Sequence, residues 1–248
     1  MGKTHEALIK AEREIDKNLP QPSGKTQKAM VAFSSNRGLV RPTPKWYEEL
    51  KTRLQTQHSN GSIKTLMFTG TIHGEGSTTT AAGFASSLAE GYQLKVLLMD
   101  LNFRTPGLHK FFDTDETHRL LDIFSDKNGF ESILSGVSHG NLHVITCSGD
   151  ISASAALFES EWFAEFLKTM RASFDYVILD APPVTVFSDA QILGRQVDGV
   201  ILIVESGKTR RQVALKAKLD IEAAGGNFLG VVLNKRKFYI PKWIYRRL

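Results

Sequence analysis

Six apolar runs of strand length recur between residues 64 and 234, and stretches of helical composition separate them. The runs are TLMFTG, KVLLMD, LHVITC, YVILDA, GVILIVE and FLGVVLN, which begin at residues 65, 95, 142, 176, 199 and 228. Because nearly every residue in them is apolar, we expect strands that are buried on both faces. This pattern predicts an α/β fold, doubly wound, with a mainly parallel sheet flanked by helices.

The rest of the chain is predicted to extend this domain at both ends. The proline-rich stretch before the first apolar run is typical of a linker. On each side of this linker, apolar residues at helical spacing favour a short helix. The expected parts are an N-terminal extension (1–60) with helices over 4–17 and 46–57 and a linker over 19–45, the domain (61–234), and a C-terminal tail (235–248).

The composition is that of a globular protein, with 42% hydrophobic residues. No apolar run is long enough to span a bilayer, and the charged N-terminus lacks the apolar core of a secretory signal. The single cysteine, Cys147, excludes an internal disulfide and any paired-cysteine metal site. Together these features predict a cytoplasmic location.

The C-terminal tail carries a higher density of positive charge than the net charge of +5 for the whole chain indicates. Six lysines and arginines lie within the last fourteen residues, interleaved with aromatic residues. Such a tail suits peripheral contact with anionic lipid, or binding to nucleic acid or an acidic partner. Packing of the aromatic residues back onto the domain is an equally good interpretation, and composition leaves both open.

The segment TIHGEGSTTTAAGFA, at residues 71–85, joins the first apolar run to a helical stretch. Gly74 and Gly76 allow successive backbone N–H groups to point at one anion, and the start of a helix adds the positive end of its dipole. Thr78 stands where a hydroxyl can bind Mg²⁺, but Ser77 stands where a phosphate-binding loop normally has lysine. The segment predicts a nucleotide site that lacks its usual cation.

Polar residues end three of the other runs. Asp100 and Asp180 follow two strands directly, and Asn234 ends the last one. The carboxyl ends of parallel strands are where such folds bind ligands, so these side chains are expected near the glycine loop. A carboxylate there can hold Mg²⁺ or orient an attacking nucleophile.

Four stretches carry a resemblance to a known family: GEGSTTTAAGFASSLA, VLLMDLNFRTPGLHKFF, FDYVILDAPPV with its continuation SDAQILGRQVDGVILIVESGKTRR, and LGVVLNKRKFYIPKWIYRRL. They resemble the bacterial tyrosine kinases of capsule and exopolysaccharide synthesis, which are relatives of the Min- and Par-type partitioning ATPases. The resemblance implies a P-loop nucleotide-binding fold, ATP or ADP with Mg²⁺ as ligand, and phosphate transfer to a tyrosine-rich tail. It also implies a membrane-anchored polysaccharide co-polymerase of the chain-length determinant type as partner, and a homo-oligomer. Through this partner the chain would be peripheral at the inner membrane.

The resemblance assigns roles to residues at matching positions. Catalytic roles fall on Asp100, Asp180 and Arg104, and metal binding on Thr78, Asp100 and Asp180. The predicted nucleotide-binding residues, which include the asparagine that meets adenine, are Gly74, Glu75, Gly76, Ser77, Thr78, Thr79 and Asn234.

The departures from the family pattern are equally specific. Ser77 replaces the loop lysine, Asn102 replaces the second aspartate of a D-x-D pattern, and Ile72 stands where partitioning ATPases carry an alternative lysine. The oligomerisation pattern E-x-x-R-x-x-R is reduced to EELKTRL, in which Leu54 takes the last position, and the tail holds only two tyrosines. Loss of a charged hydrogen bond weakens binding by roughly 1.5–3 kcal/mol, whereas loss of a preorganised donor slows catalysis by about 10²–10³.

Three functional hypotheses follow. The first is a nucleotide-binding regulator of exopolysaccharide synthesis and export, with reduced or no kinase activity. The second is an active tyrosine kinase in which Arg104, Lys208 or a cation of a partner compensates for Ser77. The third is a partitioning-type ATPase whose tail binds membrane or DNA, although nucleic acid is not the expected partner under the first two.

Overall fold

The computed structural model of the chain describes residues 30–32, 44–57, 63–112, 138–146 and 154–236. The helix predicted over residues 4–17 and the tail beyond residue 236 lie outside this part, so those expectations stay predictions.

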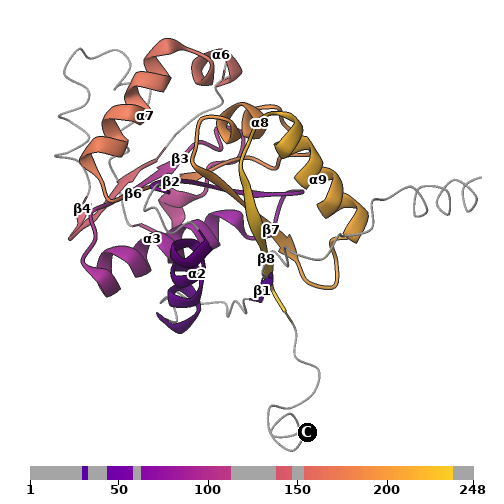
Figure 1. Cartoon of the computed structure of the whole chain (residues 1–248), viewed down its shortest axis with the longest axis horizontal. Coiled ribbons are helices and arrows are strands. Elements are labelled where there is room, and N and C mark those ends of the chain that lie inside the picture. The colour runs from indigo at the N-terminus through magenta and orange to yellow at the C-terminus, as the bar shows by residue number, and fades with distance from the viewer. Residues whose placement is uncertain (1–29, 33–43, 58–62, 113–137, 147–153, 237–248) are drawn as a thin grey trace, which may run out of the picture.

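A single twisted sheet forms the centre of the molecule (Figure 1). Its spatial order is β1-β8-β7-β2-β6-β3-β5-β4, and every neighbouring pair is parallel except β4 with β5. This confirms the predicted fold class. The strands are β1 (Met30–Ala32), β2 (Thr65–Gly70), β3 (Val96–Asp100), β4 (Ser138–His139), β5 (Leu142–Ile145), β6 (Tyr176–Asp180), β7 (Gly199–Glu205) and β8 (Phe228–Asn234).

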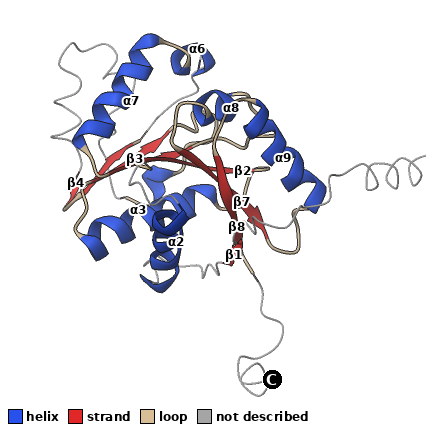
Figure 2. Ribbon diagram, viewed as in Figure 1, coloured by secondary structure: helices blue, strands red, loops and turns tan. Residues whose placement is uncertain are grey.

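Helices cover both faces of the sheet (Figure 2). One layer contains α2 and α3, and the other contains α6, α7, α8 and α9. A short 3₁₀ helix, η1, follows β3. The bounds are α2 (Pro44–Gln57), α3 (Ser77–Tyr92), η1 (Leu108–Lys110), α6 (Ser154–Phe158), α7 (Glu161–Ser173), α8 (Asp189–Gly194) and α9 (Arg211–Ala223). None of the helices in the described part is long and apolar enough to cross a membrane.

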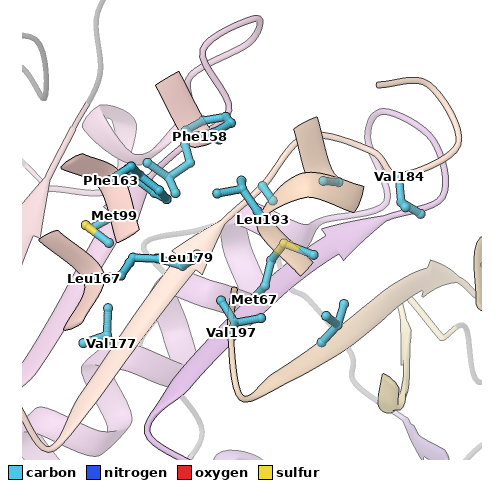
Figure 3. Packing of buried hydrophobic residues seen from close by; sticks show 14 of the residues in the cluster. Met67, Met99, Phe158, Phe163, Leu167, Val177, Leu179, Val184, Leu193 and Val197 are labelled. Carbon is cyan, nitrogen blue, oxygen red and sulfur yellow. The ribbon is translucent and has the colours of Figure 1, made fainter. Parts of the chain in front are cut away.

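Successive residues of the central strands enter two separate cores. Met67 belongs to the core that also contains Leu193 of α8 and Phe163 of α7 (Figure 3), whereas its neighbours Leu66 and Phe68 belong to the core on the side of α2 and α3. All six residues of β2 are buried. The continuous apolar runs therefore reflect burial on both faces, as the sequence predicted.

The predicted linker contains a strand that the sequence did not reveal. Met30–Ala32 pairs in parallel with Val231–Leu233 of β8 and extends the sheet at that edge. The prediction of a linker over residues 19–45 is therefore wrong at these three positions. Three residues are too few to show a periodic pattern, so only the open edge of β8 determines their conformation.

Helix α2 begins two residues before its predicted start and packs on α3. The ring of Tyr47 lies where a side chain at Gly83 would project, so the glycine is needed for this close approach. Burial raises the pKa of Tyr47 to about 12. Leu54, the last position of the reduced oligomerisation pattern, is buried in the same core, while the Lys51 ammonium lies 3.1 Å from the centre of the Tyr92 ring.

Asp198 joins three elements at the amino ends of the strands. Its carboxylate accepts hydrogen bonds of 2.8 Å from the backbone N–H groups of Lys64 and Thr65, and it pairs with Arg171 of α7. Burial alone would raise the pKa of Asp198, but these backbone donors and the guanidinium hold it below its usual value. The ionised carboxylate therefore stabilises the folded state.

Replacing Asp198 with asparagine should lower the free energy of unfolding by about 1–2 kcal/mol near neutral pH, because the backbone donors lose a charged acceptor. Because the folded-state pKa of Asp198 is depressed, its contribution is complete above about pH 4 and is lost as the pH falls below that value. Urea unfolding of both proteins across this pH range measures the difference.

Glu165→Gln serves as the control, because Glu165 pairs with Lys168 and both side chains are mostly exposed. This variant should unfold within about 0.5 kcal/mol of the wild type at every pH. If the free energy of unfolding of Asp198→Asn stayed below that of the wild type by the same amount at acidic pH, the ionised Asp198 carboxylate would not be the stabilising group.

Candidate functional site

The predicted site residues meet at the carboxyl-terminal edge of the sheet. β2 lies between β7 and β6, and β6 lies beside β3. In the β3–β6 register Asp100 is directly opposite Asp180, and both side chains are fully buried. The loop after β2 leads into α3 at Ser77, so three strand ends and one helix start converge.

The glycines of the loop have the conformations that the sequence predicted. Gly74 and Gly76 have φ values of 85° and 92°, in the left-handed region that favours glycine. Gly76 is the N-cap of α3, and no side chain caps the helix there. The first N–H groups of α3 are thus left for an anion at the positive end of the helix dipole.

Glu75 takes part in the loop in a way that its motif position did not reveal. Its carboxylate is buried beneath the loop and accepts the N–H groups of Thr71 at 2.5 Å and Ile72 at 3.1 Å. The hydroxyl of Thr209, from the loop between β7 and α9, donates to the same carboxylate. The side chain of Glu75 therefore stabilises the loop, and only its backbone remains for a ligand.

The two aspartates have different surroundings. Asp100 accepts the N–H groups of Asn102 at 3.1 Å, Gly107 at 2.9 Å and Leu108 at 3.0 Å, which folds the segment after β3 around it. Asp180 accepts no hydrogen bond of normal geometry on either oxygen from the described residues. Burial and the neighbouring charge of Asp100 raise the pKa of Asp180 well above its usual value, and the hydroxyl of Thr78 opposes this shift.

These surroundings match a divalent cation with few protein ligands. A buried carboxylate without a partner is costly unless a cation or a proton occupies it. The described residues contain no cluster of three or more His, Cys, Asp or Glu side chains arranged for a metal. One or two carboxylates and a hydroxyl suit Mg²⁺, which completes its octahedron with water and phosphate oxygens.

Thr78, on the first turn of α3, lies beside the carboxylate of Asp180. A Cβ at Gly107 would lie 3.1 Å from the Thr78 methyl group, so the segment after β3 packs closely on this residue. Thr79, the next residue, is half-buried in the same turn. Thr78, Asp100 and Asp180 are therefore brought together as predicted, and their roles as metal ligands remain a proposal.

The second departure, Asn102, has a structural role in this arrangement. Its side-chain oxygen accepts the N–H and the hydroxyl of Thr105, both at 3.3 Å, and closes a turn. Arg104 projects from this turn at the surface, with its guanidinium 5.2 Å from the centre of the Phe187 ring. The imidazole of His73 meets the same ring edge-on, so Phe187 connects the glycine loop with the segment after β3.

The cation nearest the glycine loop is one that we did not predict. Lys235, directly after β8, donates from its ammonium to the carbonyl of Gly74 and lies 3.2 Å from the Glu205 carboxylate. In the sequence Lys235 belongs to the basic tail, and its position next to Asn234 is the signal that places it near the nucleotide site. Lys208 is exposed and pairs with Glu205 at 3.3 Å.

Asn234 also contacts the loop. Its side-chain amide donates to the carbonyl of Glu75 at 2.8 Å, and its oxygen accepts the N–H of Lys235 at 2.8 Å. A Cβ at Gly76 would overlap this amide, which explains why glycine is required there for steric reasons as well as for its φ. Its predicted contact with adenine stays a prediction.

Comparison with known proteins agrees with this geometry. Residues 64–212 match the family described as an AAA domain. The tyrosine-protein kinase YwqD of Bacillus subtilis (strain 168) is 32% identical over 212 residues, which cover 85% of this chain and 87% of that protein. The tyrosine-protein kinase CpsD of Streptococcus pneumoniae is 33% identical over 216 residues, which cover 82% of this chain and 89% of that protein.

The fold agrees with the sequence match. The crystal structure of the chimerical protein CapA2B2 superposes with a TM-score of 0.75 at 25% identity, over 85% of this chain and 95% of that one. The family match over residues 64–212 covers the glycine loop and both aspartates. The chain therefore belongs to the bacterial tyrosine kinase family.

Proposed function

We propose that this chain binds ATP or ADP with Mg²⁺ and regulates exopolysaccharide synthesis and export with reduced or no kinase activity. The observation that carries the proposal is the buried Asp180 carboxylate, which accepts no hydrogen bond of normal geometry from the described residues and lies beside Thr78 and Asp100. This is the charge that a magnesium nucleotide would neutralise. Two positions that differ from the family pattern lie in the segments that meet at this site: Ser77 begins α3 one residue before Thr78, and Asn102 follows Asp100 by two residues.

Binding depends on backbone groups more than on side chains. The N–H groups of the loop and of the first turn of α3 would hold the phosphates, and Thr78, Asp100 and Asp180 would hold Mg²⁺. When bound, the ion would neutralise charge on the phosphate oxygens. This arrangement retains affinity without a lysine at Ser77, because a cradle of N–H groups needs no side-chain charge.

Phosphoryl transfer needs groups that this chain lacks at their usual places. Ser77 cannot deliver a positive charge to the transferred phosphate, and loss of one such donor slows catalysis by about 10²–10³. Asn102 cannot accept the proton of a tyrosine hydroxyl, and its oxygen is already bonded to Thr105. Binding with little turnover is the expected result.

The regulatory role concerns a partner at the membrane. A nucleotide-dependent conformation of this cytoplasmic chain, or of its homo-oligomer, would be sensed by a membrane-anchored polysaccharide co-polymerase. The family membership supports this proposal. Peripheral membrane contact through the basic tail would place the chain beside such a partner.

An active tyrosine kinase is the second candidate. The relatives in Bacillus subtilis and Streptococcus pneumoniae are both named tyrosine-protein kinases, and similarity extends over more than four fifths of this chain. A cation other than a lysine at position 77 would then act on the phosphate. Phosphotyrosine on the purified protein, at a rate that Asp100→Ala abolishes, would establish this alternative.

Replacing Asp180 with asparagine should raise the stability of the nucleotide-free protein and weaken its binding of the magnesium nucleotide. The nucleotide-free variant should gain about 1–3 kcal/mol of stability at neutral pH, because the wild type must either ionise a buried carboxylate or keep it protonated, and asparagine does neither. The raised pKa lets the folded wild type keep a proton that the unfolded chain loses, so wild-type stability should fall as the pH rises above about 4. Thermal unfolding without nucleotide measures both effects.

The same variant should lose the gain in ATP affinity that Mg²⁺ provides, which calorimetry with and without the ion detects. Asp189→Asn is the matched control, since Asp189 is a buried carboxylate that accepts the Ser154 hydroxyl at 2.7 Å. That control should lose stability and keep the magnesium effect. Unchanged magnesium dependence in Asp180→Asn would contradict the proposed metal site.

Restoring the missing groups tests the catalytic part. Ser77→Lys should tighten ATP binding by about tenfold to a hundredfold, because a charged hydrogen bond to phosphate is regained. Measurable phosphate transfer to tyrosine should require Asn102→Asp as well. Titration calorimetry and labelled ATP follow the two quantities, and robust wild-type transfer that neither substitution increases would overturn the assignment of a weakened kinase.

A further inference from the structure

The carbonyl side of the glycine loop is held by the end of β8. The Lys235 ammonium donates to the carbonyl of Gly74, and the Asn234 amide donates to the carbonyl of Glu75 at 2.8 Å. Two consecutive peptide groups of the loop thus point their oxygens toward β8. Both contacts come from residues that are about 160 positions away in sequence.

The planarity of the peptide bond determines where the N–H groups of these peptides point. In a trans peptide the N–H points opposite to the C=O, and the described residues contain no cis peptide bond. The N–H groups of Glu75 and Gly76 therefore point away from β8. Neither donates a hydrogen bond within the described part of the chain, so both remain available to an anion.

We propose that Lys235 is a positioning residue that compensates for the missing loop lysine through the backbone. Its charge orients and polarises the peptide between Gly74 and Glu75, so that the N–H of Glu75 becomes a stronger donor toward phosphate. A charged donor on a carbonyl polarises the whole amide, and neighbouring hydrogen bonds strengthen one another. This inference rests on the proposed nucleotide binding and names how the loop retains affinity for phosphate.

The backbone of Lys235 itself supports this role. Its φ is 54°, in the left-handed region that few non-glycine residues adopt, and its N–H bonds to Asn234. This turn directly after β8 accompanies a side chain that reaches the glycine loop. Glu205, at the end of β7, holds the ammonium from the other side at 3.2 Å.

Lys208 provides a matched comparison. It is a lysine that contacts the same oxygen of Glu205, at 3.3 Å, but it is exposed and bonds to no atom of the glycine loop. Replacing Lys208 removes one positive charge from the same neighbourhood and leaves the Gly74 carbonyl with its donor. A difference between the two lysine variants therefore reports the loop contact and not the local charge.

Lys235→Met keeps the length and apolar stem of the side chain and removes its charge. It should weaken ATP and ADP binding by about tenfold to a hundredfold and adenosine binding by less than about threefold, because only phosphates use the loop donors. Lys208→Met should bind all three ligands within about threefold of the wild type. Lys235→Arg should recover most of the loss, since it retains a charged donor.

Ser77→Lys in the Lys235→Met background should also recover ATP affinity, because a charge then reaches the phosphates directly. Equal loss of ATP and adenosine affinity in Lys235→Met would overturn the proposal, since it would indicate a general structural role. Unchanged affinity for all three ligands would overturn it as well.

Amide NMR on the nucleotide-free protein tests the polarised peptide without any ligand. The ¹H–¹⁵N resonance of Glu75 should move in Lys235→Met more than the other loop amides, and it should stay in place in Lys208→Met. If the wild type binds no nucleotide, the proposed function fails, while this spectrum still decides the role of Lys235. An unmoved Glu75 resonance would contradict the inference.

Discussion

Burial of β2, β3 and β6 on both faces is the constraint on which the rest of the structure depends. Side chains of these strands enter one apolar core or the other, so there is no solvated face for a charged residue. Charged groups can therefore stand only at the ends of these strands. Because parallel strands end at the same edge, this burial itself gathers Asp100 and Asp180 beside the glycine loop.

The site contains groups that oppose folding. Asp180 is a fully buried carboxylate directly opposite the buried Asp100, and neither of its oxygens accepts a hydrogen bond of normal geometry from the described residues. Such features persist when the surrounding structure imposes them and a ligand relieves them. This cost in folding free energy arises at the carboxyl-terminal edge of the sheet. At the opposite edge, backbone N–H groups and Arg171 satisfy the charge of Asp198.

The loop illustrates how one motif contains two kinds of residue. Gly74 and Gly76 are required for backbone conformation, whereas Glu75 between them turns its carboxylate inward and bonds to Thr71, Ile72 and Thr209. Residues distant in sequence complete this support from the ends of β7 and β8. The conformation of the loop is therefore a property of the whole carboxyl edge of the sheet.

The sequence by itself determined the fold class, the five longest strands to within one residue at either end, and the gathering of the glycine loop with Asp100 and Asp180. Hydrophobic periodicity and glycine placement are local signals, so a linear sequence carries them. Only the tertiary structure decided that Met30–Ala32 extends the sheet and that Lys235 reaches Gly74. It also decided that, among the described residues, Asp100 has three backbone donors while Asp180 has none. Those outcomes depend on contacts between distant residues, and no local pattern specifies which strand edge is open or which side chain crosses to a loop.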